Sequence, residues 1–407
     1  MRSGELIGLE VWDGLAHRGR AAVRWSGRGA DAVLEAVTPL EEGAAPGAGE
    51  GLCVLPGLVD THVHLLGYAG GESVDFATWP VLTRPDEQVL HGLSHAQRAL
   101  RGGVTTVRDM AADETQVSLR SAVDAGVVEG PRVLVNCMVG MTAGHHDLFT
   151  PRTAPDRHPT ADGVDACRAL VRRWARAGTD GIKICTSGGG LSSGDGPGWR
   201  NHTRAEVAAI VDEAHALGMR VAAHAHSAEG ISVALDEGVD SLEHATLMTP
   251  ELAERAAAAG VPVAPTLLIN EVIAERRVPV SAETADKAAA LVARRDGLLR
   301  AAAAAGVQFV LGTDANGFHV QFGDQMAELR RMAEVLGLSP EQVLRSGTSA
   351  AAAAVGRGDL GVLAQGARAD LLVLRGRPWE HLEDLRVENV VAAVSRGRVV
   401  HGSLPGS

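Results

Sequence analysis

The stretch Leu58–Leu65 reads LVDTHVHL, a short apolar run that contains two histidines near its end. Similar runs recur along the chain and alternate with segments rich in Ala, Leu, Arg and Glu, such as residues 205–218 and 283–306. The other runs are TTVRDM from Thr105, RVLVNCM from Arg132, GIKICTS from Gly181, RVAAHAH from Arg220, SLEHAT from Ser241, PVAPTLL from Pro262 and QFVLGTDA from Gln308. This alternation is typical of parallel strands joined by crossover helices. Eight such units between residues 57 and 357 predict an α/β fold with a (β/α)₈ TIM barrel.

The two ends of the chain have a different pattern. Residues 1–56 and 358–407 contain short alternating segments, among them AAVRWSG, DLLVLRG and VVAAVSRGRVVHG. We expect these segments to form one small β-sandwich domain assembled from both termini, beside a barrel that spans 57–357. The Gly/Ala/Pro-rich segment Gly43–Gly51 is the expected link into the barrel.

Composition excludes several classes of function. The formal net charge of −12 argues against nucleic acid, because a phosphate-binding surface needs a basic excess. The first ten residues contain no apolar signal segment, and no run reaches the roughly 18 apolar residues of a membrane span. The four cysteines form no CxxC pair, so neither a disulfide framework nor a cysteine zinc site is expected: Cys53, Cys137, Cys167 and Cys185. We therefore expect a cytoplasmic protein with no nucleic-acid or membrane partner.

Lysine is rare in this chain, and one lysine lies in an apolar strand. Of the 38 Lys and Arg residues only Lys183 and Lys287 are lysine, and Lys183 lies within the predicted buried run GIKICT. Burying an ammonium group is unfavourable without a partner, but lysine, unlike arginine, can lose its proton. The neutral amine can add CO₂ and become a carbamate, an anionic ligand with two oxygens. A lysine paired with a carboxylate and a Schiff-base lysine remain as alternatives.

Histidine, lysine and aspartate occur at or near the ends of predicted strands one, four, five, six and eight. They are His62 and His64, Lys183, His224 and His226, His244, and Asp314. Residues i and i+2 of a strand share a face, so the two histidines of an HxH pair can bind one ion. Such a pair alone could also be two ordinary histidines of the core or of the surface. A barrel-end aspartate by itself often only caps a helix. Together these imidazoles and carboxylates suit zinc, with manganese and cobalt as alternatives.

These motifs resemble the amidohydrolase superfamily: PGLVDTHVHL, the lysine of strand four, the histidines of strands five and six, and the GTDA aspartate. The phrases TTVRDM, TAGHHD, GIKICTSGG, AHAHS, SLEHAT and LGTDA are similar to one branch of it. That branch contains imidazolonepropionase-like proteins, Xaa-Pro dipeptidases, zinc carboxypeptidases acting on N-acyl amino acids, and ochratoxin-hydrolysing amidases. The resemblance covers essentially the whole chain, including the split β-domain, and it implies a homo-oligomer.

The resemblance implies a role for each matching residue. His62, His64 and Asp314 would hold a first divalent ion, His224 and His244 a second, and a carbamylated Lys183 would bridge the two. His145 matches a histidine thought to contact the substrate carbonyl. His226 stands where relatives often have tyrosine, and Tyr68 is the only tyrosine of this chain.

The expected mechanism follows from this ligand set. Two ions about 3.5–4 Å apart can share a hydroxide, because metal binding lowers the pKa of water from 15.7 toward ~7. Asp314 would accept a proton and pass it to the leaving nitrogen, and His145 or His226 would stabilise the oxyanion. The expected substrate is a small-molecule amide, either an N-acyl amino acid or an Xaa-Pro-like peptide.

Several loop residues are candidates for substrate binding. Arg152 or Arg200 could bind a substrate carboxylate bidentately, although both also fit ordinary surface charges. His146 and His319 are further candidates, and His319 could replace a histidine that relatives carry after GTDA. Three long loops, 67–85, 140–161 and 188–201, follow strands one, three and four, and the last is glycine-rich enough to close over a substrate.

Two other functions compete with this hypothesis. A cyclic amide (imidazolone or lactam) hydrolase or a deaminase would use related ligands, although mononuclear deaminases of the superfamily do not need the lysine. A catalytically silent barrel that only binds a ligand would need no metal. A phosphate-binding barrel is disfavoured, since no Gly-rich phosphate loop follows strands seven and eight.

Overall fold

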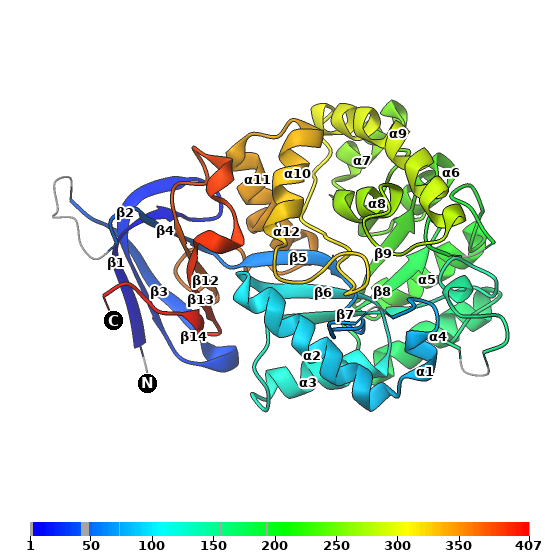
Figure 1. Cartoon of the computed structure of the whole chain (residues 1–407), viewed down its shortest axis with the longest axis horizontal. Coiled ribbons are helices and arrows are strands. Elements are labelled where there is room, and N and C mark those ends of the chain that lie inside the picture. The colour runs from blue at the N-terminus through cyan, green and yellow to red at the C-terminus, as the bar shows by residue number, and fades with distance from the viewer. Residues whose placement is uncertain (1–2, 42–48, 73, 155–156, 193, 407) are drawn as a thin grey trace.

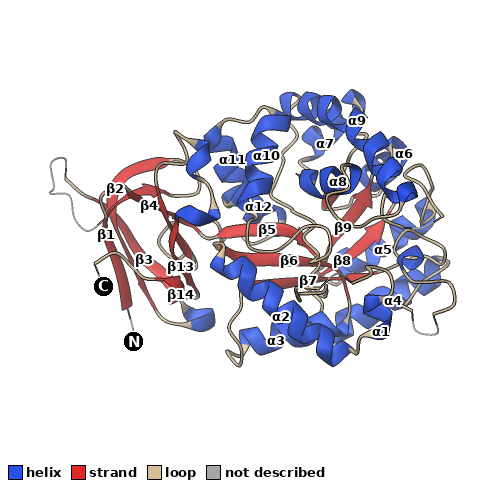
Figure 2. Cartoon of the chain, viewed as in Figure 1, coloured by secondary structure: helices blue, strands red, loops and turns tan. Residues whose placement is uncertain are grey.

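The larger part of the molecule is a parallel β-barrel surrounded by helices (Figures 1 and 2). The computed structural model describes residues 3–41, 49–72, 74–154, 157–192 and 194–406. Neighbouring barrel strands follow chain order and are all parallel: β5 (Leu58–Val63), β6 (Val104–Ala112), β7 (Arg132–Met138), β8 (Gly181–Cys185), β9 (Arg220–Ala225), β10 (Ser241–His244) and β11 (Val263–Ala264). These strands are almost entirely buried, as expected when helices cover a parallel sheet.

The helices follow the strands along the chain, and most pack outside the barrel. They are α1 (Trp79–Leu82), α2 (Pro85–Arg101), α3 (Glu114–Asp124), α4 (Val164–Ala177), α5 (Arg204–Ala216), α6 (Ala228–Asp236), α7 (Pro250–Ala259), α8 (Leu267–Ala274), α9 (Ala282–Ala304), α10 (Met326–Leu336), α11 (Pro340–Gly347) and α12 (Ser349–Ala354). Several begin at residues whose side chains cap the helix. Thr203 and Ser339, for example, each form a capping box with the residue three positions later, at the starts of α5 and α11.

The barrel is closed by a segment that is not a regular strand. Residues 308–315 bond to both edge strands: Val263 N–H donates to Gln308 O (2.9 Å) and His64 N–H donates to Ala315 O (2.8 Å). The expectation of a full eighth strand is therefore corrected to an irregular segment in the same place. The expected strand from Pro262 to Leu268 ends at Ala264, because Thr266 is left-handed (φ 46°) and α8 begins at Leu267. The predicted α/β barrel with a second sheet from both termini is confirmed.

The second sheet contains strands from both ends of the chain. Its order is β14-β13-β12-β4-β1-β2-β3, with β1 (Ser3–Trp12), β2 (His17–Ser26), β3 (Val33–Pro39), β4 (Leu52–Pro56), β12 (Leu371–Arg375), β13 (Val390–Ser395) and β14 (Arg398–Gly402). The sheet curls on itself, since Trp25 Nε1 of β2 donates to Gly397 O in the turn between β13 and β14. The two halves therefore enclose one core, as the layers of a sandwich do. Of the expected link 43–51, residues 43–48 lie outside the described residues.

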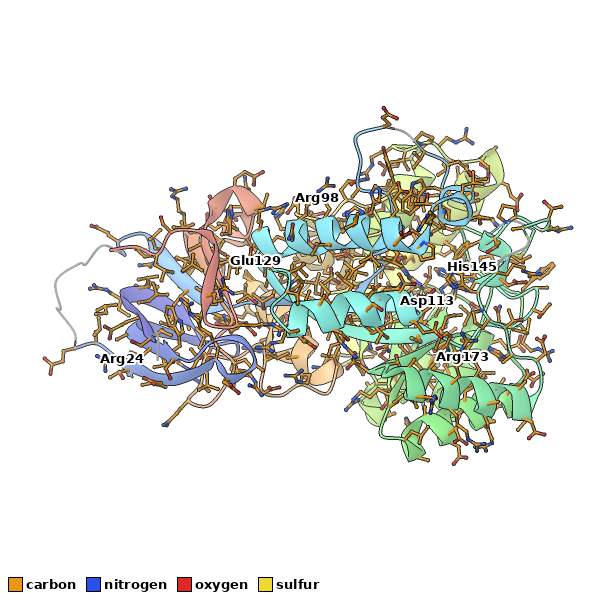
Figure 3. All side chains as sticks on the ribbon, turned by 90° about the horizontal axis from the view of Figure 1, so that it is seen from below. Arg24, Arg98, Asp113, Glu129, His145 and Arg173 are labelled. Carbon is orange, nitrogen blue, oxygen red and sulfur yellow. The ribbon has the colours of Figure 1, made fainter. Side chains whose placement is uncertain are left out.

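The small domain supports the amino ends of the barrel strands. Gly57 N–H, just before β5, donates to Asp370 O (2.9 Å), and Arg132 at the start of β7 donates to the Asp370 carboxylate (3.1 Å). The carboxyl ends of the strands consequently open at the other end of the molecule. Figure 3 shows this separation: Arg24 lies in the small domain, and His145 lies at the far end of the barrel. Among the described residues, no helix has the length and apolar character needed to span a membrane.

Candidate metal centre

A first cluster of ligands, His62, His64 and Asp314, lies where the barrel closes. Asp314 Oδ1 is 3.0 Å from His64 Nε2 and 3.7 Å from His62 Nε2. The two histidines come from the end of β5, and the aspartate comes from the irregular closing segment that bonds beside it. The three ligand atoms lie within 4.8 Å of one another, so they can surround one ion.

A second cluster consists of His224, His226 and His244, from the ends of β9 and β10. Their ligand atoms also lie within 4.8 Å of one another, and each pair of rings has its centroids 4.7 Å apart. The sequence hypothesis places only His224 and His244 on an ion and makes His226 an oxyanion donor. In the structure His226 lies as close to the other two histidines as they lie to each other.

Lys183 on β8 lines the same cavity as both clusters. Its side chain is 3% exposed, and Nζ has no hydrogen-bond partner among the described residues. Burial lowers the pKa of this amine below its ordinary value. An unpaired buried amine normally destabilises a fold, so the Lys183 amine requires either a polar partner or a chemical modification. A carbamate between two groups of histidine and aspartate ligands satisfies that requirement, and the donor set fits a pair of divalent cations.

The ring nitrogens that face away from the clusters are held by neighbouring groups. The Nδ1 atoms of His64, His226 and His244 contact, respectively, Met110 O (2.9 Å), Thr246 Oγ1 (2.7 Å) and Thr266 Oγ1 (2.6 Å). Each of these contacts fixes the ring and leaves Nε2 for the site, as outer partners do for metal-ligating histidines.

Burial keeps four of the clustered histidines neutral. It lowers the pKa of His62 to about 4 and that of His226 to about 3, and it also lowers the pKa values of His224 and His244. Since only the neutral imidazole has a free lone pair, these side chains are in the ligand form at pH 7.

A buried ion pair that the sequence hypothesis did not include orients His62. Glu243 Oε2 is 2.8 Å from His62 Nδ1, and its other oxygen accepts a hydrogen bond from Arg108 (2.8 Å). Arg108 also donates to Thr61 O (2.6 Å) and to Ser241 Oγ (3.1 Å). Burial would raise the pKa of Glu243, but Arg108 and His62 outweigh it and hold that pKa below the ordinary value. The sequence signal for this ion pair was the presence of Arg108 in the strand run TTVRDM and of Glu243 in the strand run SLEHAT.

Backbone strain is concentrated at the carboxyl ends of the strands. Ala111, His244, Thr266 and Asp314 have φ values of 53°, 67°, 46° and 55°. The left-handed region is unfavourable for residues other than glycine, and such residues often occur at functional sites. Here the strain accompanies two of the proposed ligands and Thr266, whose hydroxyl fixes His244.

His145 lies beside the second cluster, on the loop after β7. Its ring stacks on His224 with centroids 4.3 Å apart, and Nδ1 is 2.6 Å from Ser192 Oγ and 3.4 Å from Asp195 Oδ2. Burial would raise the pKa of Asp195, but the hydrogen bond and charge of His145 lower it overall. A Cβ on Gly189 would lie 2.1 Å from the His145 ring. Glycine at this position therefore makes the stacked geometry possible.

The second lysine of the chain holds this loop in place. Lys287 on α9 donates to Ser192 O (2.6 Å) and Asp195 O (3.2 Å). The two residues that contact His145 are therefore anchored to a long helix. The glycine-rich loop 188–201, where it is described, is thus bonded to the barrel and positions a side chain of the site.

The predicted substrate residues divide into two groups. His146 lines a cavity of about 210 Å³ that residues of both ligand clusters also line. His319 is buried beside it, with Nδ1 3.3 Å from the Asn316 amide nitrogen. Arg152 and Arg200 are exposed and are not among the residues that line the cavity. Of the described lining residues, none is an arginine.

The chain is similar to known proteins along most of its length. The family model described as Amidohydrolase family matches residues 53–401. Ochratoxinase from Aspergillus niger is 29% identical over 367 residues, covering 84% of this chain and 74% of its own. Imidazolonepropionase from Cutibacterium acnes is 27% identical over 346 residues, covering 82% and 78%. A crystal structure of a prolidase complexed with N-methylphosphonate-L-proline superposes with a TM-score of 0.86 at 31% identity, covering 99% of this chain and 100% of its own.

Proposed function

This chain belongs to the amidohydrolase family, and from that premise we propose that it cleaves the amide bond of an N-acyl amino acid or an Xaa-Pro-like peptide with two divalent cations. Membership of the family makes it a hydrolase of carbon–nitrogen bonds. The names of its relatives support an amide substrate. Ochratoxinase and prolidase occur among the similar proteins. Imidazolonepropionase is also among them, so a cyclic amide is the second candidate substrate.

One observation carries the proposal: the buried amine of Lys183, which has no hydrogen-bond partner in the described part of the chain, lines a cavity together with two ligand clusters. A carbamate formed there would add anionic oxygen ligands to the cavity that both clusters line. His62, His64 and Asp314 would hold one zinc ion, and His224 with His244 would hold the other. A mononuclear deaminase would not require this lysine as a ligand, and a catalytically silent binding barrel would not require either ligand cluster.

The ions and the side chains would divide the chemistry. When bound, the cations supply Lewis acidity, which makes water a nucleophile near neutral pH and polarises a carbonyl oxygen. Burial would raise the pKa of Asp314, but His62 and His64 outweigh it and lower that pKa to about 2. Asp314 is thus ionised at pH 7 and able to take a proton and return it to the leaving nitrogen.

His145 and His226 are the proposed hydrogen-bond donors to the substrate carbonyl. Nδ1 of His145 contacts Ser192 and Nδ1 of His226 contacts Thr246, so Nε2 of either ring would be the donor, in the tautomer or charge state in which Nε2 carries a proton. Either residue would stabilise the developing oxyanion, the role that tyrosine has in many relatives.

The decisive experiment measures metal content and turnover together. The zinc- and manganese-loaded enzyme is assayed with N-acyl amino acids, Xaa-Pro dipeptides, lactams and lactones. We expect about two ions per chain and hydrolysis of at least one acyclic amide. Lys183→Ala should lose both ions and activity, with partial rescue by a short-chain acid, whereas Lys287→Ala, at the other lysine, should keep both ions. Full metal content and normal turnover in Lys183→Ala would refute the proposal, and activity on lactams alone would favour the second candidate.

A further inference from the structure

Three phenylalanines form a cage over the proposed metal centre, and we propose that it binds an uncharged aromatic group of the substrate. Phe76, Phe149 and Phe318, the aromatic cage, all line the cavity whose base holds the two ligand clusters. The inference rests on the proposed function and specifies its substrate: an amide with an aryl group close to the cleaved bond.

The distribution of phenylalanine in this chain supports a binding role. The chain has five phenylalanines, and three of them line this single cavity. The other two, Phe309 and Phe322, are only 5% and 6% exposed and belong to the core. The three cage residues are only partly buried, so aromatic surface stays open toward the cavity. Apolar surface left open inside a pocket is the feature that ligand sites use for affinity.

The cage is assembled by loops that are far apart in the sequence. Phe76 follows β5, Phe149 follows β7, and Phe318 follows the closing segment of the barrel. The Phe76 ring makes edge-to-face contacts with both other rings, and its centroid lies 5.5 Å from that of Phe149 and 5.2 Å from that of Phe318. Edge-to-face contacts of this kind also accept the ring of a ligand.

The cage lies within reach of the reacting atoms. The Phe149 ring centroid is 4.7 Å from that of His145, which in turn stacks on His224 at 4.3 Å. Two ring contacts thus connect the cage to the second ligand cluster. An aryl group separated from the scissile carbonyl by one or two bonds would therefore contact Phe149 while the carbonyl faced His145.

The charges around the cavity favour a neutral group. Apolar side chains such as Leu66, Leu191 and Ile269 surround the cage, and Lys183 is the one lysine or arginine among the described lining residues. Aromatic cages also bind organic cations, and Asp113 lines this cavity. Asp113 Oδ1 accepts the Thr115 N–H (2.7 Å) as the cap of α3, and Asp314, the other carboxylate among the described lining residues, belongs to the first ligand cluster. We therefore assign the cage to a neutral ring.

The test compares two metal-chelating probes that differ only by one phenyl group. Acetohydroxamate and phenylacetohydroxamate are titrated calorimetrically into the zinc-loaded enzyme, so the readout does not depend on turnover. Burying one phenyl group should make the second probe bind about 10- to 100-fold more tightly. Phe76→Ala, which removes the ring that contacts both others, should reduce that ratio by about tenfold. Phe322→Leu, outside the cavity, is the matched control and should keep the ratio.

Each contrary result points to a different failure. Equal binding of both probes to the wild type would overturn the aromatic cage and leave the metal-dependent function standing. Binding of neither probe by enzyme exposed to zinc would overturn the proposed function and this inference with it. A probe with trimethylammonium in place of phenyl that binds more tightly than phenylacetohydroxamate would assign the cage to cations instead.

Discussion

Replacing Arg108 with methionine should destabilise the metal-free chain by about 3–5 kcal/mol, the range for a buried ion pair that loses one partner. Arg108 and Glu243 are 3% and 0% exposed, so solvent cannot replace the missing guanidinium. The substitution removes the 2.8 Å bond to Glu243 together with the bonds to Thr61 O and Ser241 Oγ. Glu243 would remain buried with only His62 and Ser241 as partners.

The double variant separates this mechanism from simple loss of packing. In Arg108→Met with Glu243→Gln the buried charge is gone, and the amide oxygen can still accept from His62. We expect the double variant to be about 1–2 kcal/mol less stable than wild type, which makes it more stable than Arg108→Met alone. Urea unfolding at pH 7 in chelator is measured for four proteins: wild type, Arg108→Met, Glu243→Gln and the double variant. Arg173→Met, at an exposed arginine, is the control and should change stability by less than about 0.5 kcal/mol.

Loss of the Glu243 carboxylate should also weaken metal binding. Because Glu243 fixes the His62 ring, Glu243→Gln should weaken zinc affinity by about 10- to 100-fold. If the destabilisation of the double variant equals the sum of the two single variants, Arg108 and Glu243 are not coupled. The account of how the first ligand cluster is held would then be wrong.

Three further predictions concern loops and buried histidine. Gly189→Ala should lower kcat/KM by about 10- to 100-fold with little change in zinc content, because its Cβ would displace the His145 ring; an unchanged kcat/KM would contradict this role. Lys287→Met should lower kcat and quicken amide exchange or proteolysis around Asp195 while zinc content stays the same, and unaltered loop protection would count against it. Burial, aided by the Arg98 charge, lowers the pKa of His95 to about 4. The folded state thus resists protonation of His95, and between pH 6.5 and 4 the contribution of this residue to stability falls as pH falls, by about 2 kcal/mol at pH 5; His95→Leu should remove that share of the pH dependence in urea unfolding.

The sequence was sufficient for the barrel and for placing the candidate ligands at its strand ends, because both predictions depend on local patterns. Alternating apolar runs predict the strands, and imidazole or carboxylate at the strand ends predicts the site. Lys183 could be singled out because the chain otherwise uses arginine almost exclusively.

The remaining features depend on contacts between distant segments. PVAPTLL looks like a strand, but the left-handed Thr266 ends it so that α8 can cover the cavity. Glu243 and Arg108 meet across the barrel interior from β10 and β6, and no spacing rule pairs them. The cage residues Phe76 and Phe318 belong to loops that come together only in the folded chain.

The central claim, two cations joined by a modified Lys183, is tested most directly by one crystallographic measurement. Crystals of protein prepared with zinc and bicarbonate are examined by anomalous scattering at the zinc edge, with density calculated for the lysine side chain. The account predicts two zinc peaks, one beside His62, His64 and Asp314 and one beside His224 and His244, with carbamate density on Lys183 between them. A bare Lys183 amine with a single peak, or with none, would contradict it.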